Sequence, residues 1–329
     1  MIYGINDRLP LKKLLLFGLQ MMLSVFVATV LIANICGVAI SGALVGAGLS
    51  TIIYVLVTKR GSPMIISNSG AFVAPVLAAL ALGGYTAVAI GGLVTCFVYC
   101  LFGFIFTRIP MDNIYKIFPK ALIGAVTVVI GVNLMAFITT YVQIDNKINM
   151  WGVSAAFVTM LSIALISHYA KGVARILPFL LGTLIGYIYS IILTVTGVFK
   201  VVDFSVFSNL SILALPDFAF SHWGAIEPSV LISLIILYLA FTVSAMMECL
   251  SDTAALGNII GVDLYRNPGL GRIFIGEGLA NLSTAWLGGL GACSYGESVA
   301  CVGFSKVAST RVTITAAVML MILGIIDPV

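Results

Sequence analysis

Three carboxylates, Glu248, Asp252 and Glu297, lie inside stretches of sequence that carry almost no other charge. An ionisable side chain at the depth of a lipid bilayer is costly, so such residues are rare and usually mark the path of a substrate or a proton. Glu248 and Asp252 are four residues apart and therefore share one face of a helix. Two carboxylates this close in a low dielectric do not both stay ionised, so one of them can carry a proton. The three residues indicate a secondary transporter.

The elements that hold these carboxylates are membrane spans. The chain has 329 residues, of which 61% are hydrophobic and 9% are charged. A soluble domain carries about 25% charged residues, so this sequence could not cover a soluble surface. Apolar runs long enough to cross a bilayer recur along the chain. The eleven predicted spans are 14–35, 38–58, 66–82, 85–107, 117–140, 151–169, 176–199, 229–257, 270–288, 292–306 and 311–327. The predicted fold class is an all-α polytopic membrane protein.

The basic residues predict how these spans are oriented. If the N-terminus is cytoplasmic, 14 of the 16 Lys and Arg residues fall on the cytoplasmic side, and only Lys147 and Lys200 fall outside. An excess of basic residues in cytoplasmic loops is the usual rule for membrane proteins. We therefore predict a multi-pass protein of the cell membrane with a cytoplasmic N-terminus. The net charge of +4 reflects this topology and does not indicate nucleic-acid binding.

The third and tenth spans are not smooth helices. The third opens with residues 67–75 (SNSGAFVAP), and the tenth opens with residues 288–298 (GGLGACSYGES). Both openings are rich in small and polar residues, and Pro75 suits the first turn of a helix. Backbone that is not helical is tolerated at membrane depth only where protein buries it or where it lines a cavity. Each segment therefore predicts an extended stretch that leads into a half-helix.

The two broken spans occupy matching positions, because one is the third span and the other is the third counted from span eight. Interrupted spans in corresponding places of two halves indicate a transporter site built on inverted repeats. Two half-helix N-termini that meet there would direct backbone N–H groups at one small ligand. We expect residues 67–72 and 291–296 to run extended and antiparallel beside each other, with Glu248 and Glu297 at one pocket.

These motifs resemble a known family. Tyr295-Gly296-Glu297 after a Gly-rich stretch resembles the tenth-span signature of uracil permeases in the nucleobase–ascorbate transporter (uracil/xanthine permease) family. The stretch from Glu248 to Leu270 resembles the eighth span of that family and the loop that follows it. Residues 69–75 are similar to the family's third-span strand, and Gln20 with residues 28–31 (ATVL) resembles its first span. The resemblance runs from the first span to the last residue.

The resemblance implies a fourteen-span fold of two inverted seven-span repeats. Residues 1–110 and 229–329 would form a core domain, residues 111–228 would form the first half of a gate domain, and family members often form homodimers through the gate. The chain ends inside the eleventh predicted span. The resemblance therefore implies that the remaining gate spans are absent, and we expect these 329 residues to insert into lipid with weak or absent uptake.

The implied function is a proton-coupled nucleobase permease that imports uracil or a related lactam base by alternating access. The sequence departs from the family pattern at some positions, and these departures leave a second substrate class open. Uracil permeases carry a histidine four residues after the eighth-span glutamate, whereas this chain has Asp252, which looks more like xanthine and urate carriers. Those carriers have Gln-Asn where this chain has Glu297-Ser298. The alternative is therefore a xanthine or urate (oxopurine) permease.

A lactam base presents N–H donors and carbonyl acceptors along one planar edge. Buried carboxylates accept such N–H groups, half-helix amides donate to carbonyls, and aromatic rings cover the faces of the base. The expected substrate-binding residues are Glu248, Glu297, Phe72, Tyr295, Gly296 and Ala71. Asp252, together with Glu248, is expected to couple the proton. No cofactor or metal is expected.

Other interpretations remain open for some residues and for the whole chain. Glu277 could face a cavity or pair with Arg272, and Asp252 could be a structural partner of a nearby hydroxyl. A channel-like pore or a non-functional transporter fragment would also contain broken spans. An enzyme is not expected, because the paired aspartate motifs of an intramembrane protease are absent and no histidine lies at membrane depth beside a serine.

Overall fold

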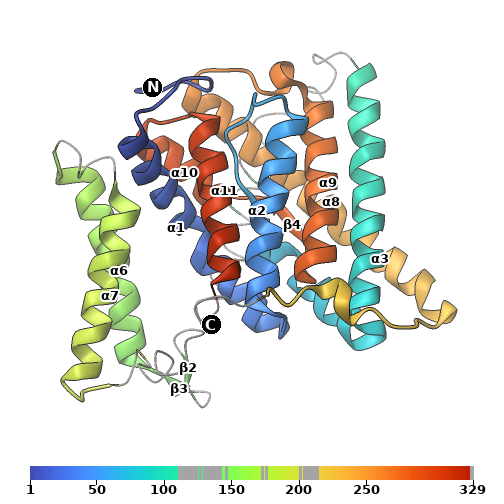
Figure 1. The fold of residues 1–329 in the computed structure, drawn as a ribbon, viewed down its shortest axis with the longest axis horizontal. Helices are drawn as coiled ribbons and strands as arrows, with labels where there is room; N and C mark the ends of the chain where they lie inside the picture. Colours follow the sequence, from blue (N-terminus) through green and yellow to red (C-terminus); the bar gives the residue numbers. More distant parts are fainter. Residues whose placement is uncertain are drawn as a thin grey trace.

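The computed structural model describes residues 1–109, 125, 128, 143–144, 147–171, 174, 177–199, 202 and 215–326. Most of these residues are helical (Figure 1). The helices are α1 (Leu11–Cys36), α2 (Ile40–Val57), α3 (Val73–Arg108), α6 (Met150–Tyr169), α7 (Pro178–Val195), α8 (Pro228–Ile260), α9 (Leu270–Gly288), α10 (Gly296–Ser305) and α11 (Thr310–Ile325). The strands are β1 (Ile66–Asn68), β2 (Gln143–Ile144), β3 (Lys147–Ile148) and β4 (Ala292–Ser294), and short helical turns cover Gly70–Phe72, Ala219–His222 and Tyr265–Gly269.

The described helices agree with the predicted spans. Among the described residues, six helices are long and apolar enough to cross a membrane, and α11 is a shorter apolar helix. A helix overlaps every predicted span except 117–140, of which the structure describes only residues 125 and 128. The predicted break between the third and fourth spans is also present, because Gly83 and Gly84 have non-helical backbone angles inside α3. The count of eleven spans remains a prediction.

Two groups of helices stand apart in Figure 1. The larger group holds α1, α2, α3, α8, α9, α10 and α11, and in it α9 packs against both α2 and α3. The smaller group is the pair α6 and α7, which pack on each other, and α7 also contacts α1. None of the residues of α6 is buried. The described contacts of the pair with the larger group are therefore made mainly by α7, which also packs Phe179 on Phe304 of α10.

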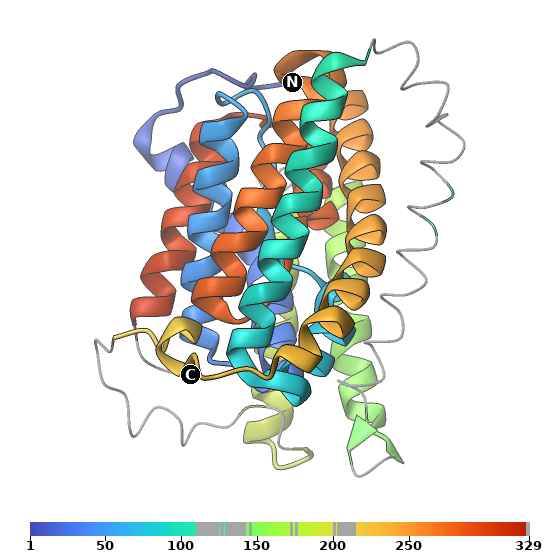
Figure 2. The same cartoon turned by 90° about the vertical axis from the view of Figure 1, so that its right-hand side faces the viewer.

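Close packing inside the larger group depends on small residues. Figure 2 shows α9 side by side with the long part of α3 that follows its bend. Near one end, Gly103 of α3 and Gly271 of α9 face each other, and a Cβ atom on Gly103 would lie 2.9 Å from the carbonyl oxygen of Gly271. Small residues at such crossings let two helix backbones approach in a membrane protein. This contact sets the distance between the two helices that flank the centre of the bundle.

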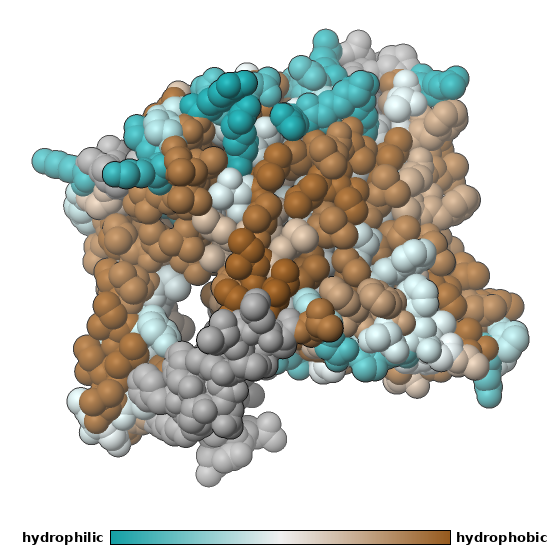
Figure 3. All heavy atoms as spheres, in the orientation of Figure 1, coloured by the Kyte–Doolittle hydropathy of each residue, from teal (hydrophilic) through white to brown (hydrophobic). Residues whose placement is uncertain are grey.

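Hydrophilic residues lie at two opposite edges of the molecule, with an apolar band between them. Figure 3 shows hydrophilic residues along the edge at which the N-terminus lies, above a broad hydrophobic band. The ends of α2, α3 and α10 and the start of α11 lie at this edge, and Ile2 and Ile5 hydrogen-bond there to Lys306 and Thr310. An apolar band between polar edges is the surface expected of a multi-pass membrane protein.

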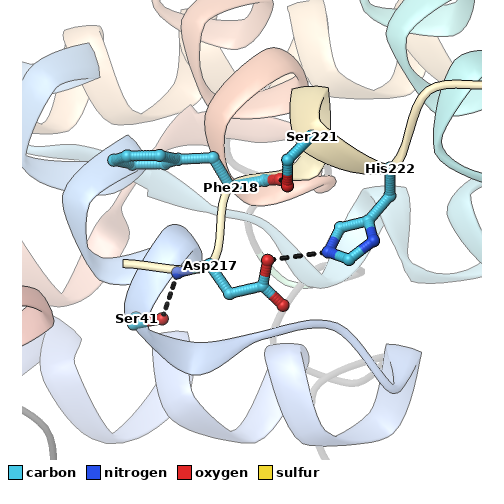
Figure 4. Close-up of polar contacts among 5 residues, drawn as sticks. All are labelled: Ser41, Asp217, Phe218, Ser221 and His222. Carbon is cyan, nitrogen blue, oxygen red and sulfur yellow. Dashed lines mark hydrogen bonds and ion pairs between the residues drawn. The ribbon is translucent and has the colours of Figure 1, made fainter. Parts of the chain in front are cut away.

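The segment before α8 crosses the opposite face of the larger group. His222 Nε2 lies 2.7 Å from Asp217 Oδ1, and the amide of Asp217 donates to Ser41 Oγ at 3.1 Å (Figure 4). The His222 ring also stacks on Tyr85, with the ring centroids 5.3 Å apart. These contacts attach the segment to α2 and to the bend in α3, so the start of α8 is held close to both.

The α3–α9 contact gives a first prediction. A methyl group in Gly271→Ala would lie 2.6 Å from the Gly103 carbonyl oxygen and would overlap Thr107. We expect this overpacking to cost about 1–3 kcal/mol of stability, measured as a lower melting temperature of the purified protein in detergent. The control is Gly303→Ala in α10, where the new Cβ meets Ile259 at an ordinary 3.4 Å. Equal melting temperatures for the two variants would contradict the prediction.

Candidate functional site

The two broken segments pair with each other at the centre of the larger group. β1 and β4 are antiparallel, with Ile66 opposite Ser294, Ser67 opposite Cys293 and Asn68 opposite Ala292. The amide of Ser69 extends the ladder by donating to the Gly291 carbonyl at 2.9 Å. The predicted antiparallel arrangement is therefore confirmed for residues 67–69 and 291–294, whereas Gly296, which was also predicted as extended, begins α10. Residues 70–72 are wrongly predicted as extended, because they form a helical turn that leads directly into α3.

Every residue of the two strands is buried, so their backbone groups need protein partners. On the β1 side, hydroxyl groups of neighbouring helices supply them. Ser50 and Thr51 of α2 donate to the Ile66 carbonyl at 2.9 and 2.8 Å, and Thr51 Oγ1 accepts from the Ile66 amide at 3.2 Å. The Ser67 hydroxyl lies 2.8 Å from that of Thr29 in α1. Helices α1 and α2 thereby hold β1 in place.

On the β4 side, helix α9 supplies the partners. Asn281 Nδ2 donates to the Ala292 carbonyl at 2.7 Å, and Glu277 Oε1 accepts from the Ser294 amide at 3.1 Å. Glu277 also accepts a weak hydrogen bond from the Cys293 thiol, with a separation of 3.6 Å. Both α9 side chains are buried. The two-stranded ladder is therefore bound on both sides by side chains of the bundle.

A helix begins directly after each strand. The turn Gly70–Phe72 and then α3 follow β1, and the Ser69 hydroxyl caps that turn by accepting from the Ala71 amide at 3.2 Å. Helix α10 follows β4 at Gly296, and Ser298 links this helix to the segment before β1 by accepting from the Ile65 amide at 3.3 Å. Because the strands are antiparallel, the two helices leave the ladder at opposite ends. Their N-termini, which carry partial positive charge, flank it.

Three of the carboxylates singled out from the sequence come together beside this ladder. The Ser69 hydroxyl donates to Glu248 Oε2 at 3.4 Å, so Glu248 of α8 lies at the capped start of α3. Glu248 interacts electrostatically with Asp252 and with Glu297, which lies in the first turn of α10. Glu248 and Glu297 are half-buried, whereas Asp252 is buried. The two carboxylates are thus near enough to influence each other, and their convergence on one pocket remains a prediction.

Asp252 lies deeper than the other two. Its Oδ1 atom lies 3.5 Å from the position that a Cβ would take on Gly296, and its carboxylate is in hydrogen-bonding range of the Ser294 side chain. Its Oδ2 atom is buried without a hydrogen-bond partner among the described residues. A buried acceptor without a partner is costly unless a proton or a ligand group satisfies it. Asp252 thus touches the start of α10 as well as the ladder.

The two aromatic residues of the predicted site, Phe72 and Tyr295, lie at opposite ends of the ladder, each following one strand. Phe72 is 1% exposed and packs so closely on Gly291 that any side chain there would overlap its ring. Tyr295 links β4 to α10, is 7% exposed, and its carbonyl accepts from the Ser298 hydroxyl at 2.7 Å. Ala71 is half-buried and Gly296 is exposed. All seven predicted site residues therefore belong to the ladder, to the two helix starts that follow it, or to α8.

Glu277 has a structural role that the sequence analysis did not predict. It does not pair with Arg272, whose guanidinium instead donates to the Pro268 carbonyl at 3.5 Å. Glu277 is fully buried, bonds to β4 and interacts electrostatically with Glu248. The signal that could have found it is its position inside the apolar ninth span, 20 residues before Glu297. A charged residue there requires a buried partner.

The arrangement brings hydrogen-bond acceptors and donors of several elements to one place. Glu248 and Glu297 offer acceptor oxygens from two helices, and the starts of α3 and α10 carry backbone donors and positive partial charge. Among the described residues, no group of three or more His, Cys, Asp or Glu side chains could hold a metal ion.

The bond from Ser294 to Glu277 gives a second prediction. In Glu277→Ala the Ser294 amide loses its buried acceptor, which costs about 1–3 kcal/mol. In Glu277→Gln the amide oxygen can still accept that hydrogen bond, so the loss should be smaller. Melting temperatures of the two purified variants in detergent measure the difference. A Gln variant as unstable as the Ala variant would show that the hydrogen bond is not what holds β4.

Comparison with known proteins places this chain in a family. The model of the Permease family (Xan_ur_permease) matches residues 12–329. The chain is 28% identical to the uracil permease of Bacillus caldolyticus over 330 residues, which cover 100% of this chain and 75% of that protein. It is 29% identical to the uracil permease of Escherichia coli strain K12, covering 98% and 72% of the two chains. It is 28% identical to the putative pyrimidine permease RutG of the same strain, covering 97% and 71%.

Solved structures show the same fold at low sequence identity. The transmembrane domain of a cyanobacterium bicarbonate transporter, BicA, matches with a TM-score of 0.62 and 14% identity, over 97% of this chain and 83% of that chain. The murine anion transporter Slc26a9 in its inward-facing state matches with a TM-score of 0.68 and 12% identity, over 97% and 57%. Since the family model matches nearly the whole sequence, this multi-pass membrane protein belongs to the Permease family and is a permease, not an enzyme.

Proposed function

We propose that this protein is a proton-coupled nucleobase permease that imports uracil or a related lactam base by alternating access. The observation that carries the proposal is the meeting of Glu248 and Glu297 beside two helix starts that flank the β1–β4 ladder. A lactam base carries N–H donors beside carbonyl acceptors. Two carboxylates next to two sets of backbone donors complement that edge. The names of the relatives, uracil permease and putative pyrimidine permease, support the same substrate class.

Each predicted residue has a place in this proposal. Glu248 and Glu297 accept the N–H groups of the base, and the amides at Ala71 and Gly296 donate to its carbonyl groups. Phe72 and Tyr295 shape the site at the two ends of the ladder. Asp252 carries the proton with Glu248, because its buried Oδ2 has no partner among the described residues and a proton would remove its charge.

The two groups of helices are proposed to be the two domains of an alternating-access carrier. Residues 1–110 and 229–329 form the core that holds the site, and residues 111–228 belong to the gate. The absence of buried residues in α6 supports this division, because a domain that moves cannot be packed deeply against its partner. We further propose that the hydrophilic face with the N-terminus is cytoplasmic, since most of the basic residues belong to it, and that the protein forms homodimers.

Asp252 also supports the second candidate, an oxopurine such as xanthine. Its carboxylate lies beside Gly296, so it offers one more acceptor near the start of α10. A purine has a second ring with a further N–H group, which a third carboxylate could accept. Competition by unlabelled uracil and xanthine for binding of labelled uracil to the purified protein separates the two candidates. If neither uracil nor xanthine binds, the nucleobase assignment fails.

The carboxylates at the site give a third prediction. In Glu248→Gln and Glu297→Gln a neutral amide replaces a charged acceptor and places an NH₂ group beside a substrate donor. A hydrogen bond to a charged group contributes about 1.5–3 kcal/mol, so uracil binding should weaken about 10- to 150-fold. Equilibrium binding of radiolabelled uracil to the purified variants measures this loss.

Glu227→Gln is the matched control, because Glu227 is exposed just before α8 and its carboxylate accepts a hydrogen bond only from the nearby Ser229 among the contacts described. It should bind uracil as the unmodified protein does. Normal binding in both Glu248→Gln and Glu297→Gln would remove these residues from the site. An equal loss in Glu227→Gln would show a general effect of charge instead.

Proton coupling gives a fourth prediction. If a proton binds with the base, linkage requires the dissociation constant to rise with pH, by at most about tenfold per pH unit. Asp252→Asn is permanently neutral at that position, so its affinity for uracil should stay flat between about pH 6 and about pH 8. Binding curves across this range test both expectations. A variant with the same pH dependence as the unmodified protein would exclude Asp252 as the coupling residue.

A further inference from the structure

A basic cavity lies at the face of the molecule that carries the N-terminus, away from the β1–β4 ladder. It has a volume of about 470 Å³, and its polar lining comes from Asn6, Arg8, Arg60, Thr310 and Arg311. The three arginines belong to three separate parts of the chain: the segment before α1, the turn after α2, and the first turn of α11. Their gathering is therefore a property of the fold and not of one basic stretch of sequence.

The backbone around the cavity is fixed by hydrogen bonds. The Thr310 amide donates to the Ile5 carbonyl at 3.0 Å, the Ser309 hydroxyl donates to the Asp7 carbonyl at 2.8 Å, and the Ala308 amide donates to the Tyr3 carbonyl at 2.9 Å. These bonds tie the N-terminal segment along the loop between α10 and α11. The position of Arg8 relative to Arg311 is therefore set before any ligand arrives.

The third arginine is held by an unusual turn. Lys59 and Arg60 both have positive φ angles, 52° and 58°, which residues other than glycine adopt at a cost. The Arg60 amide donates to the Val55 carbonyl at 2.8 Å, and the next amide, of Gly61, donates to Thr58 at 2.9 Å. A strained turn that persists because its surroundings fix it is typical of a functional position. This turn places Arg60 at the cavity.

The positive charge in the cavity has no acidic partner in the part of the chain that the structure describes. No ion pair joins Arg8, Arg60 or Arg311 to a carboxylate there. The nearest acid in sequence, Asp7, accepts a hydrogen bond from the Gly4 amide at 2.7 Å. Helix α11 begins at the same place, and its N-terminus adds partial positive charge. Three unpaired guanidinium groups around one cavity favour an anion.

We propose that this cavity binds the phosphate headgroup of an anionic phospholipid from the surrounding leaflet. Arginine forks match phosphate oxygens bidentately, and basic pockets between membrane helices are typical sites for such headgroups. Leu14 and Ile314 form an apolar part of the lining. They belong to α1 and α11, whose helices run from this face into the hydrophobic band of Figure 3. A lipid uses both parts of the lining, whereas free inorganic phosphate would use only the arginines.

The test uses the purified 329-residue chain in a neutral detergent, with dioleoylphosphatidylglycerol as the probe and dioleoylphosphatidylcholine as the zwitterionic comparison. Native mass spectrometry counts retained lipid, and thermal unfolding measures stabilisation. We expect retention of phosphatidylglycerol in preference to phosphatidylcholine. Arg8→Gln, Arg60→Gln and Arg311→Gln should each weaken phosphatidylglycerol binding about fivefold, since one basic residue near a membrane surface contributes about that factor.

Arg108→Gln is the matched control, because Arg108 lies at the same face but packs over the Phe104 ring outside this cavity. It should retain the lipid, and the melting temperature without lipid should be equal in all variants that fold correctly. Equal retention of the two lipids, or an equal loss in Arg108→Gln, would overturn the proposal. Stabilisation by inorganic phosphate to the same degree as by phosphatidylglycerol would also overturn it, because the site would then take a free anion.

Discussion

The requirement that every backbone group at membrane depth has a partner governs this structure. Water is absent from the hydrocarbon region, so an extended segment there must bond to protein. β1 and β4 meet the requirement by pairing with each other and by using side chains of α1, α2 and α9 for the remaining groups. The ladder therefore accounts for the presence of four buried polar side chains in the neighbouring helices: Thr29, Thr51, Asn281 and Glu277. The closely packed helices around it bring these side chains within reach.

This requirement also separates two kinds of buried acid. Glu277 is fully buried and bonded to the Ser294 amide, so its carboxylate is part of the framework. Glu248 and Glu297 are half-buried at the two helix starts, and the oxygen of Asp252 that lacks a described partner lies between the framework and those starts. The acids beside the ladder thus range from Glu277, which is buried and structural, to Glu248 and Glu297, which are half-buried. In the proposed carrier, this gradation would separate the acids that exchange protons and ligand from the acid that holds the strands.

Much of this could be predicted from the sequence because the two broken segments are unusual. Small and polar residues at 67–75 and 288–298 cannot form ordinary lipid-facing helices, so their extended character and mutual pairing followed from composition and position. The exact extent of the strands could not be predicted, since the Ser69 hydroxyl caps a turn at Gly70–Phe72 that local composition does not reveal. The framework role of Glu277 was also missed, because it depends on a contact between residues 17 positions apart that only the packed helices create.

The distance in sequence between the two strands affects how the protein is made. Ile66 and Ser294 are paired, yet the ribosome adds the residues between them at about 5–20 per second, so β1 waits roughly 10–45 s for its partner. During that time β1 already has Thr29, Ser50 and Thr51, which precede it in the chain and can satisfy part of its backbone. The hydroxyl groups of the first two helices can thus hydrogen-bond to β1 before β4 has been synthesised. The other edge of β1 gains its partner only when β4 has been made.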